Sequence, residues 1–160
     1  MLRMTKQTDY GIVLMTHLAQ DPRRHHSAPE LASELRIPLP MVSKILKLLA
    51  RHGLLVSHRG VRGGYSLARS PEEISVADLI AALEGPIAVT ECIEEAHLGF
   101  PGDCSRESFC AVRANWQRIN GAVRQALDSI TLADMTRPFP PADLVRLGGY
   151  RQAAGEREAL

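Results

Sequence analysis

Residues 40–65 read PMVSKILKLLARHGLLVSHRGVRGGY, and their apolar period changes at Gly53. Before this glycine, apolar residues recur every three or four positions, which predicts a helix with one buried face. After the glycine, two short apolar runs flank a tip rich in glycine and arginine, which predicts a β-hairpin. The inward residues of the predicted helix are Val42, Ile45, Leu46 and Leu49.

Two further helices are expected upstream of this stretch. A broad apolar stripe over residues 5–20 predicts a buried helix that ends at Asp21-Pro22. Ser27 offers an N-cap for a short second helix, which ends in a turn at residues 36–39. The order helix, helix, turn, helix, hairpin is that of a winged helix-turn-helix. The predicted fold is therefore mostly α with a small β-hairpin.

The rest of the chain divides by pattern into three segments. Ser75 begins another helical segment that stops at Gly85-Pro86, so residues 1–86 are predicted to form the winged helix-turn-helix domain. An irregular acidic loop that carries the cysteines follows at residues 87–110. Residues 111–135 are predicted to form a long C-terminal dimerisation helix, and residues 136–160 a flexible tail rich in proline and glycine.

The long helix is predicted from an apolar stripe with alternating steps of three and four residues. Such a stripe packs against another helix, which is either the same helix of a second subunit or part of the chain's own core. We favour the second subunit, a homodimer, because helix-turn-helix proteins commonly bind paired half-sites. The stripe consists of Val112, Trp116, Ile119, Val123, Leu127 (or Ala126) and Ile130.

The charges are segregated along the chain, although the net charge is only +1. Residues 1–70 carry eleven Lys and Arg against four Asp and Glu, a net +7. Residues 71–110 carry one against nine, a net −8. A basic first half suggests that this part of the chain faces a polyanion such as double-stranded DNA. A solvated surface of mixed sign is the alternative.

The candidate DNA contacts lie in the predicted third helix and in the hairpin. The major groove admits one helix, and the phosphates attract cations. The start of the helix would approach base edges, its outer face would meet phosphates or guanine, and the wing would reach the backbone or a minor groove. The alternative is that these cations only solubilise the surface. In that order, the residues are Pro40, Met41 and Ser43; Lys44, Lys47 and Arg51; and Arg59 and Arg62.

The sequence shows no feature of a membrane or secreted protein. The apolar run at residues 11–19 is too short to cross a bilayer, and we expect no signal peptide. We therefore expect a cytoplasmic protein with no membrane partner. Its odd count of three cysteines does not make a closed disulfide framework. Neither an enzyme nor a small-molecule substrate is expected, because no nucleophile–base pair or phosphate-binding loop is recognisable.

The three cysteines, Cys92, Cys104 and Cys110, fall within nineteen residues at the spacing C-x11-C-x5-C. Thiolates bind soft metals and iron–sulfur clusters, and a flexible loop lets three of them converge on one centre. The spacing matches neither a zinc ribbon nor a C-x-x-C dithiol. Residue chemistry thus favours an iron–sulfur cluster, with zinc and redox-active or structural thiols as alternatives. His25 and His26 are interpreted as a polar loop, with no metal site beside them.

Residues 1–135 resemble the winged-helix iron–sulfur regulator family that includes the IscR and NsrR types. The resemblance is strongest to the regulator encoded with SUF cluster-assembly operons. The motifs that carry it are LRMTKQTDYG at residues 2–11, VSKILK at residues 42–47, HRGVRGGY at residues 58–65, ISVAD at residues 74–78, and the three cysteines. It implies a homodimer with swapped-over long helices, three cysteine ligands per subunit, and control of cluster-assembly or stress genes.

The resemblance leaves the fourth cluster ligand open. IscR-like members carry a ligating histidine three residues after the last cysteine and a shorter gap between the first two cysteines, whereas this chain has Arg113, which does not ligate. NsrR-like members use an aspartate near the N-terminus of the partner subunit, which matches Asp9. We expect Asp9 ahead of His97, Glu91 and Asp103. Three cysteines with one other ligand fit either nuclearity, and we expect [2Fe–2S] ahead of [4Fe–4S].

Overall fold

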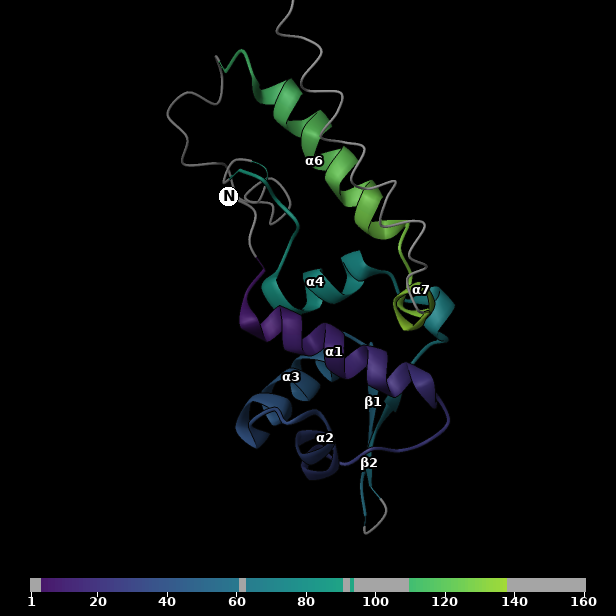
Figure 1. The fold of residues 1–160 in the computed structure, drawn as a ribbon. Helices are drawn as coiled ribbons and strands as arrows, with labels where there is room; N and C mark the ends of the chain where they lie inside the picture. The colour runs from purple at the N-terminus through teal and green to yellow at the C-terminus, as the bar shows by residue number, and fades with distance from the viewer. Residues whose placement is uncertain (1–3, 61–62, 91–92, 94–109, 138–160) are drawn as a thin grey trace, which may run out of the picture.

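The computed structural model describes residues 4–60, 63–90, 93 and 110–137. Figure 1 shows α1 to α4 and a hairpin gathered into one domain, with α6 standing beyond α4. Among these residues, no helix has the length and apolar character needed to span a bilayer. In chain order the elements are α1 (Lys6–Gln20), α2 (Ala28–Leu35), α3 (Leu39–Arg51), β1 (Leu55–His58), β2 (Gly64–Leu67), the 3-10 helix η1 (Pro71–Glu73), α4 (Val76–Glu84), α6 (Arg113–Asp128) and α7 (Leu132–Thr136).

One apolar core joins the helices of the winged domain. Helix α3 lies at its centre and contacts α1, α2, α4 and β1. Its four predicted inward residues are all fully buried, which confirms the helical period. Burial of one face turns the opposite face of α3 toward solvent, because side chains four residues apart lie on the same side of a helix.

Side-chain caps fix where the helices begin. Ser27 caps α2 in a capping box with Glu30, and Ser75 caps α4 in a capping box with Asp78, so both predicted starts are confirmed. The turn from α2 to α3 is tight because Arg36 adopts the left-handed conformation, with φ 53°. These local choices produce the predicted architecture, which is mostly helical with one two-stranded hairpin.

The predicted wing forms, and its base is fastened to the connection between α1 and α2. Strands β1 and β2 pair antiparallel, with His58 opposite Gly64. At the base of the wing, the backbone of His26 exchanges two hydrogen bonds with Tyr65 of β2, at 2.9 and 3.0 Å. The connection between α1 and α2 therefore acts as a short third edge of the hairpin.

The burial of His26 corrects the interpretation of His25 and His26 as a polar loop. His26 is only 2% exposed, whereas His25 is exposed and stacks on His58 with ring centroids 3.9 Å apart. Consecutive residues of an extended segment point to opposite sides. Because His26 pairs with β2 as a strand residue does, its side chain turns inward and that of His25 turns outward.

The C-terminal helical region differs from the single helix predicted over residues 111–135. Helix α6 ends at Asp128, and the chain then returns to the start of α4, where Ser75 and Thr131 form an isolated antiparallel bridge. Thr131 caps the new helix α7, whose Leu132 is fully buried. Helix α7 packs against α1 and η1. The region divides in two because a new cap and a core-filling leucine offer α7 a better site than continuation into solvent.

Hydrogen bonds fix the first turn of α1 to the last turn of α4. The Thr5 amide donates to Glu84 Oε1 at 2.9 Å, and the Thr8 hydroxyl donates to the same oxygen at 2.5 Å. The Gln7 side-chain amide donates to the Leu83 carbonyl at 3.0 Å. The hydrogen bonds from Thr8 and then Thr5 lower the pKa of Glu84, because they stabilise its charged form.

Glu84→Gln is expected to weaken this junction in a pH-dependent way. The lowered pKa means that the carboxylate's contribution to folding stability is fully present above its ordinary value of 4.5 and is lost as pH falls through the folded-state pKa. At pH 7 the variant should lose about 0.5–1 kcal/mol, because Glu84 is exposed and water screens the bond. Urea unfolding from pH 7 to pH 3 measures this, with Glu72→Gln as the control. A deficit that persists at pH 3 would contradict the assignment.

Candidate nucleic-acid interface and cysteine segment

The outward face of α3 presents the predicted DNA-binding residues. Helix α3 begins at Leu39, one residue before the expected start, and no side chain hydrogen-bonds its first amides. Two of the predicted residues are half-buried beside the core, and the others are exposed. The half-buried residues are Met41 and Ser43; the exposed ones are Pro40, Lys44, Lys47 and Arg51.

The predicted cations of this interface keep their charge available. Lys44, Lys47, Arg51 and Arg59 form no ion pair with any residue in the described ranges. Arg24, Arg69 and Arg124, which were not among the predicted DNA contacts, each pair with a carboxylate. An unpaired surface cation loses no intramolecular contact when it meets a phosphate, so the α3 face suits a polyanion.

Helix α3 and the wing lie at the same end of the molecule. Figure 1 shows α2, α3 and the hairpin at this end and α6 at the opposite end. Arg59 is exposed directly after β1. Arg62, the second wing arginine, lies outside the described residues. A helix in a major groove with a hairpin reaching the neighbouring backbone is the docking that this arrangement allows.

Gly64→Ala is expected to loosen the base of the wing. A Cβ at this position would lie 2.6 Å from the His26 carbonyl oxygen and 2.8 Å from its carbon, and both are backbone atoms that cannot rotate away. We expect a loss of roughly 1–3 kcal/mol of folding stability and faster hydrogen exchange of the Tyr65 amide, which donates to that carbonyl. Gly121→Ala is the control, because nothing lies within 4 Å of its Cβ position. Unchanged Tyr65 exchange in Gly64→Ala would contradict the prediction.

The structure describes the two ends of the cysteine segment, which is the acidic stretch of residues 87–110. Cys92, Cys104 and His97 lie outside the described residues, whereas Cys110 is half-buried just before α6 and its carbonyl accepts the Arg113 amide at 3.3 Å. Asp9 is exposed on the first turn of α1, the turn that is bonded to the end of α4. Asp9 therefore lies beside the point where the segment leaves the winged domain, and Cys110 lies where the segment enters α6.

A buried asparagine ties the start of this segment to α6, and sequence reasoning did not single it out. Asn120 is 5% exposed, and its Oδ1 accepts the Val89 amide at 3.1 Å. Among the described residues, it is the one buried side chain of α6. The only sequence signal is a polar residue directly beside the apolar stripe, which does not distinguish a buried asparagine from an exposed one.

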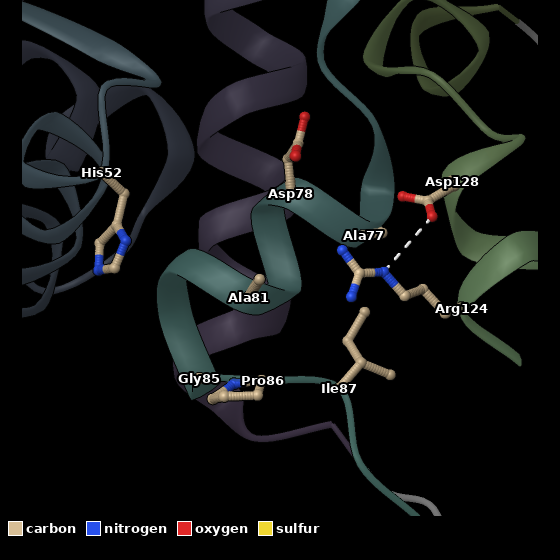
Figure 2. A pocket seen from close by; sticks show the side chains of 9 residues that line it. All are labelled: His52, Ala77, Asp78, Ala81, Gly85, Pro86, Ile87, Arg124 and Asp128. Atoms are coloured by element: carbon tan, nitrogen blue, oxygen red, sulfur yellow. Dashed lines mark ion pairs between the residues drawn. The ribbon is translucent and has the colours of Figure 1, made fainter. Parts of the chain in front are cut away.

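A pocket of about 400 Å³ separates α4 from α6 next to this contact. Figure 2 shows Arg124 reaching from α6 across the pocket toward α4, with its ion pair to Asp128 drawn. The Nε–Oδ2 distance of that pair is 3.7 Å. Gly85, Pro86 and Ile87, which lead into the cysteine segment, form one wall. Helix α6 therefore meets the winged domain around a hollow, with polar contacts at Asn120 and at Asp128, which accepts a hydrogen bond from Ser75.

The family model described as Rrf2, an iron-dependent transcriptional regulator, matches residues 4–138. The chain belongs to the Rrf2 family. Protein rrf2 of Nitratidesulfovibrio vulgaris is 30% identical over 137 residues, covering 85% of this chain and 88% of that protein. Rrf2-family relatives are transcription regulators, so the expectation of a regulator rather than an enzyme agrees with the family.

Two solved structures place this Rrf2 chain among winged-helix regulators. CymR, the global cysteine regulator of Bacillus subtilis, is 31% identical with a TM-score of 0.64, covering 85% of this chain and 97% of that one. IscR of T. potens is 31% identical with a TM-score of 0.61, covering 84% and 85%. The predicted fold class is thereby confirmed. The resemblance is confirmed at the level of the family, whereas the link to SUF operons stays a prediction.

Proposed function

We propose that this Rrf2 regulator binds paired half-sites of double-stranded DNA as a homodimer and senses through an iron–sulfur cluster held by Cys92, Cys104 and Cys110. The observation that carries the proposal is the combination, in one chain, of a basic winged domain with three cysteines that adjoin a helix whose apolar stripe is exposed. The family supports DNA-binding regulation. The cluster, the dimer and the operator are our inferences.

The dimer is inferred from the exposed stripe of α6. Val112, Trp116 and Ile119 are 50%, 38% and 45% exposed in the single chain. Asn120 and Arg124, which face the winged domain, lie about 60–100° further around the helix from the middle of the stripe, at 100° per residue. Val123 and Leu127 are half-buried, so the chain's own domain covers the stripe only in part. A second copy of α6 is the occupant that also brings two α3 helices to one duplex.

The donor set fits an iron–sulfur cluster. Three thiolates within nineteen residues match the ligands such clusters prefer, and Cys110 is held at the entry to α6. We infer that Asp9 of the partner subunit is the fourth ligand, ahead of His97, and that the cluster is [2Fe–2S]. When bound, a cluster with one non-thiolate ligand supplies a centre that is readily oxidised or lost, which suits a sensor.

The chain's own contacts suggest how ligation would reach the DNA-binding face. A cluster bound by Cys92, Cys104 and Cys110 would restrain residues 87–110 between Asn120 of α6 and the end of α4. Helix α4 packs on α3, and α6 packs on α4. Restraint of the segment would thus bias the position of α6, and with it the spacing of two recognition helices in a dimer. On the resemblance, we propose cluster-assembly genes of the SUF type as targets.

A cluster-free thiol regulator is the second candidate. The similarity to CymR, which is a cysteine regulator, favours it. In this version Cys92, Cys104 and Cys110 respond directly to oxidation, or bind zinc, and no iron is held. DNA binding through α3 and the wing is common to both candidates, so only the content of the cysteine segment separates them.

Oxygen-free purification tests the cluster. We expect iron and sulfide in the full-length protein, visible absorption typical of a cluster, and loss of both when the three cysteines are replaced by serine. Colourless protein without iron would favour the thiol candidate.

An operator selected from a random duplex library then allows the operator affinities of the holo and apo forms to be compared. Equal affinity and equal salt dependence in both forms would contradict the coupling, although not the DNA binding.

A further inference from the structure

His26 is a buried polar side chain without a partner. It is 2% exposed, and neither of its ring nitrogens has a hydrogen-bond partner among the described residues. Buried polar atoms are almost always satisfied, so an exception in a well-packed domain calls for a physical reason. A neutral imidazole always presents one bare lone pair, and a bound metal ion is one group that would use it.

The surroundings of His26 supply the other ligands. His17 of α1 lies edge-on to His26 with ring centroids 5.5 Å apart, and its Nε2 is 2.8 Å from Glu34 Oε2 on α2. The three candidate ligand atoms all lie within 4.8 Å of one another. The same three residues line a pocket of about 410 Å³. Two imidazoles and one carboxylate thus converge on one hollow from three separate parts of the chain.

We propose that His17, His26 and Glu34 form a binding site for a divalent transition-metal ion of the zinc class, with water as the fourth ligand. The site lies in the winged domain and is separate from the cysteine segment. It is independent of the proposed cluster, because it shares none of that cluster's ligands.

The ligand chemistry favours zinc over magnesium or calcium. Zinc is bound by imidazole nitrogen and carboxylate oxygen at about 2.0–2.2 Å, usually with four ligands, and two histidines with one glutamate is an established set for a site that keeps one water. Two tetrahedral ligands are then about 3.3 Å apart, which the present spacing reaches through side-chain rotation. Magnesium and calcium prefer oxygen ligands and would leave both imidazoles unused.

The local charges also permit a cation. Glu34 brings one negative charge, and its hydrogen bond to His17 holds both groups toward the pocket. Arg24 lines the same pocket, but its guanidinium is bonded to Glu30. Burial, and then the charge of Arg24, lower the pKa of His26, so its ring is neutral near pH 7 and needs to lose no proton before it binds a metal.

Such an ion would join three separate parts of the chain at this corner. Its ligands come from the end of α1, from the α1–α2 connection and from the end of α2. The His26 backbone also holds Tyr65 of the wing. Metal binding would therefore stabilise the helix-turn-helix and the base of the wing together.

Zinc content of the full-length protein tests the site. The wild type and the variants His26→Gln, Glu34→Gln and His25→Gln are dialysed against the same zinc buffer. Zinc bound by the cysteines is common to all four proteins and cancels. We expect the wild type and His25→Gln to hold one zinc per chain more than His26→Gln and Glu34→Gln. His25 is the matched control because it is the neighbouring histidine and is not one of the three proposed zinc ligands.

Thermal unfolding provides the second readout. Zinc at 100 times its dissociation constant should shift the unfolding equilibrium by about 100-fold in the wild type and His25→Gln but not in Glu34→Gln. Glu34 is exposed, so its substitution leaves the fold intact even if His26→Gln does not fold. Equal zinc content and equal zinc-induced stabilisation in Glu34→Gln and His25→Gln would overturn the proposal.

Discussion

Ile119→Glu in α6 is expected to leave a folded monomer that binds its operator at least roughly 100-fold more weakly than the wild type. Ile119 is 45% exposed in the single chain, so glutamate, which is a good helix former, fits there without loss of core packing. In a dimer joined through α6 the same carboxylate would be buried without a partner, which costs several kcal/mol. The substitution therefore acts on association and spares the subunit.

Analytical ultracentrifugation and fluorescence anisotropy with the selected operator measure the two effects. The matched control is Gln117→Glu, which adds the same charge to the same helix but about 160° around it, away from the stripe. We expect this control to remain dimeric with unchanged affinity. A dimeric Ile119→Glu protein with full operator affinity would show that the stripe of α6 is not the subunit interface.

The double variant Lys44→Gln/Lys47→Gln is expected to bind the operator about 10–100-fold more weakly and to lower the salt slope of log K by about 1.8. Both lysines are exposed on α3 and form no ion pair with a described residue, so removal of their charge leaves the folded chain unchanged. Each phosphate contact that is lost releases about 0.9 fewer counterions, which is why the slope measures the number of contacts.

Titrations of operator binding between 50 and 200 mM salt, a range of about fourfold, separate a loss of phosphate contacts from a loss of contacts to base edges. Arg118→Gln is the control, because it removes one exposed cation from α6, at the end of the molecule opposite the wing. An unchanged slope in the double variant, or an equal drop in Arg118→Gln, would contradict the placement of α3 on DNA.

The parts of the fold that follow from local pattern were predictable. The inward face of α3 needs only the recurrence of apolar residues at helical spacing, and the start of α2 needs only a serine followed three residues later by Glu30. The hairpin follows from a change of period around glycines. Each of these features is encoded within about ten neighbouring residues.

The parts that depend on distant contacts were not predictable. The end of α6 at Asp128 and the return of the chain as α7 depend on a bridge to Ser75, which lies more than fifty residues earlier. The burial of His26 depends on pairing with Tyr65 across the wing. A histidine among charged neighbours has the local pattern of a solvated loop, and only the tertiary structure shows that it meets His17 and Glu34.

The candidate interface shows the same division. Lys44 and Lys47 were placed correctly on the outer face of α3, because that position follows from the helical period. Asn120 was missed because a polar residue at the margin of an apolar stripe carries no sign of the amide that it will accept. The fourth cluster ligand stays a prediction. Asp9 would bind the cluster of the partner subunit, and the structure contains one subunit.

The bridge between Ser75 and Thr131 fixes the C-terminal end of α6 to the start of α4, and the hydrogen bond from Val89 to Asn120 holds the middle of the helix. The helix has 16 residues and is thus about 24 Å long, and its N-terminal end lies beside Cys110. A tilt of α6 by about 5° about its C-terminal end would displace its N-terminal end by about 2 Å. In a dimer joined through α6, such a tilt would change the distance between the two α3 helices, and with it the spacing of the DNA half-sites that they fit.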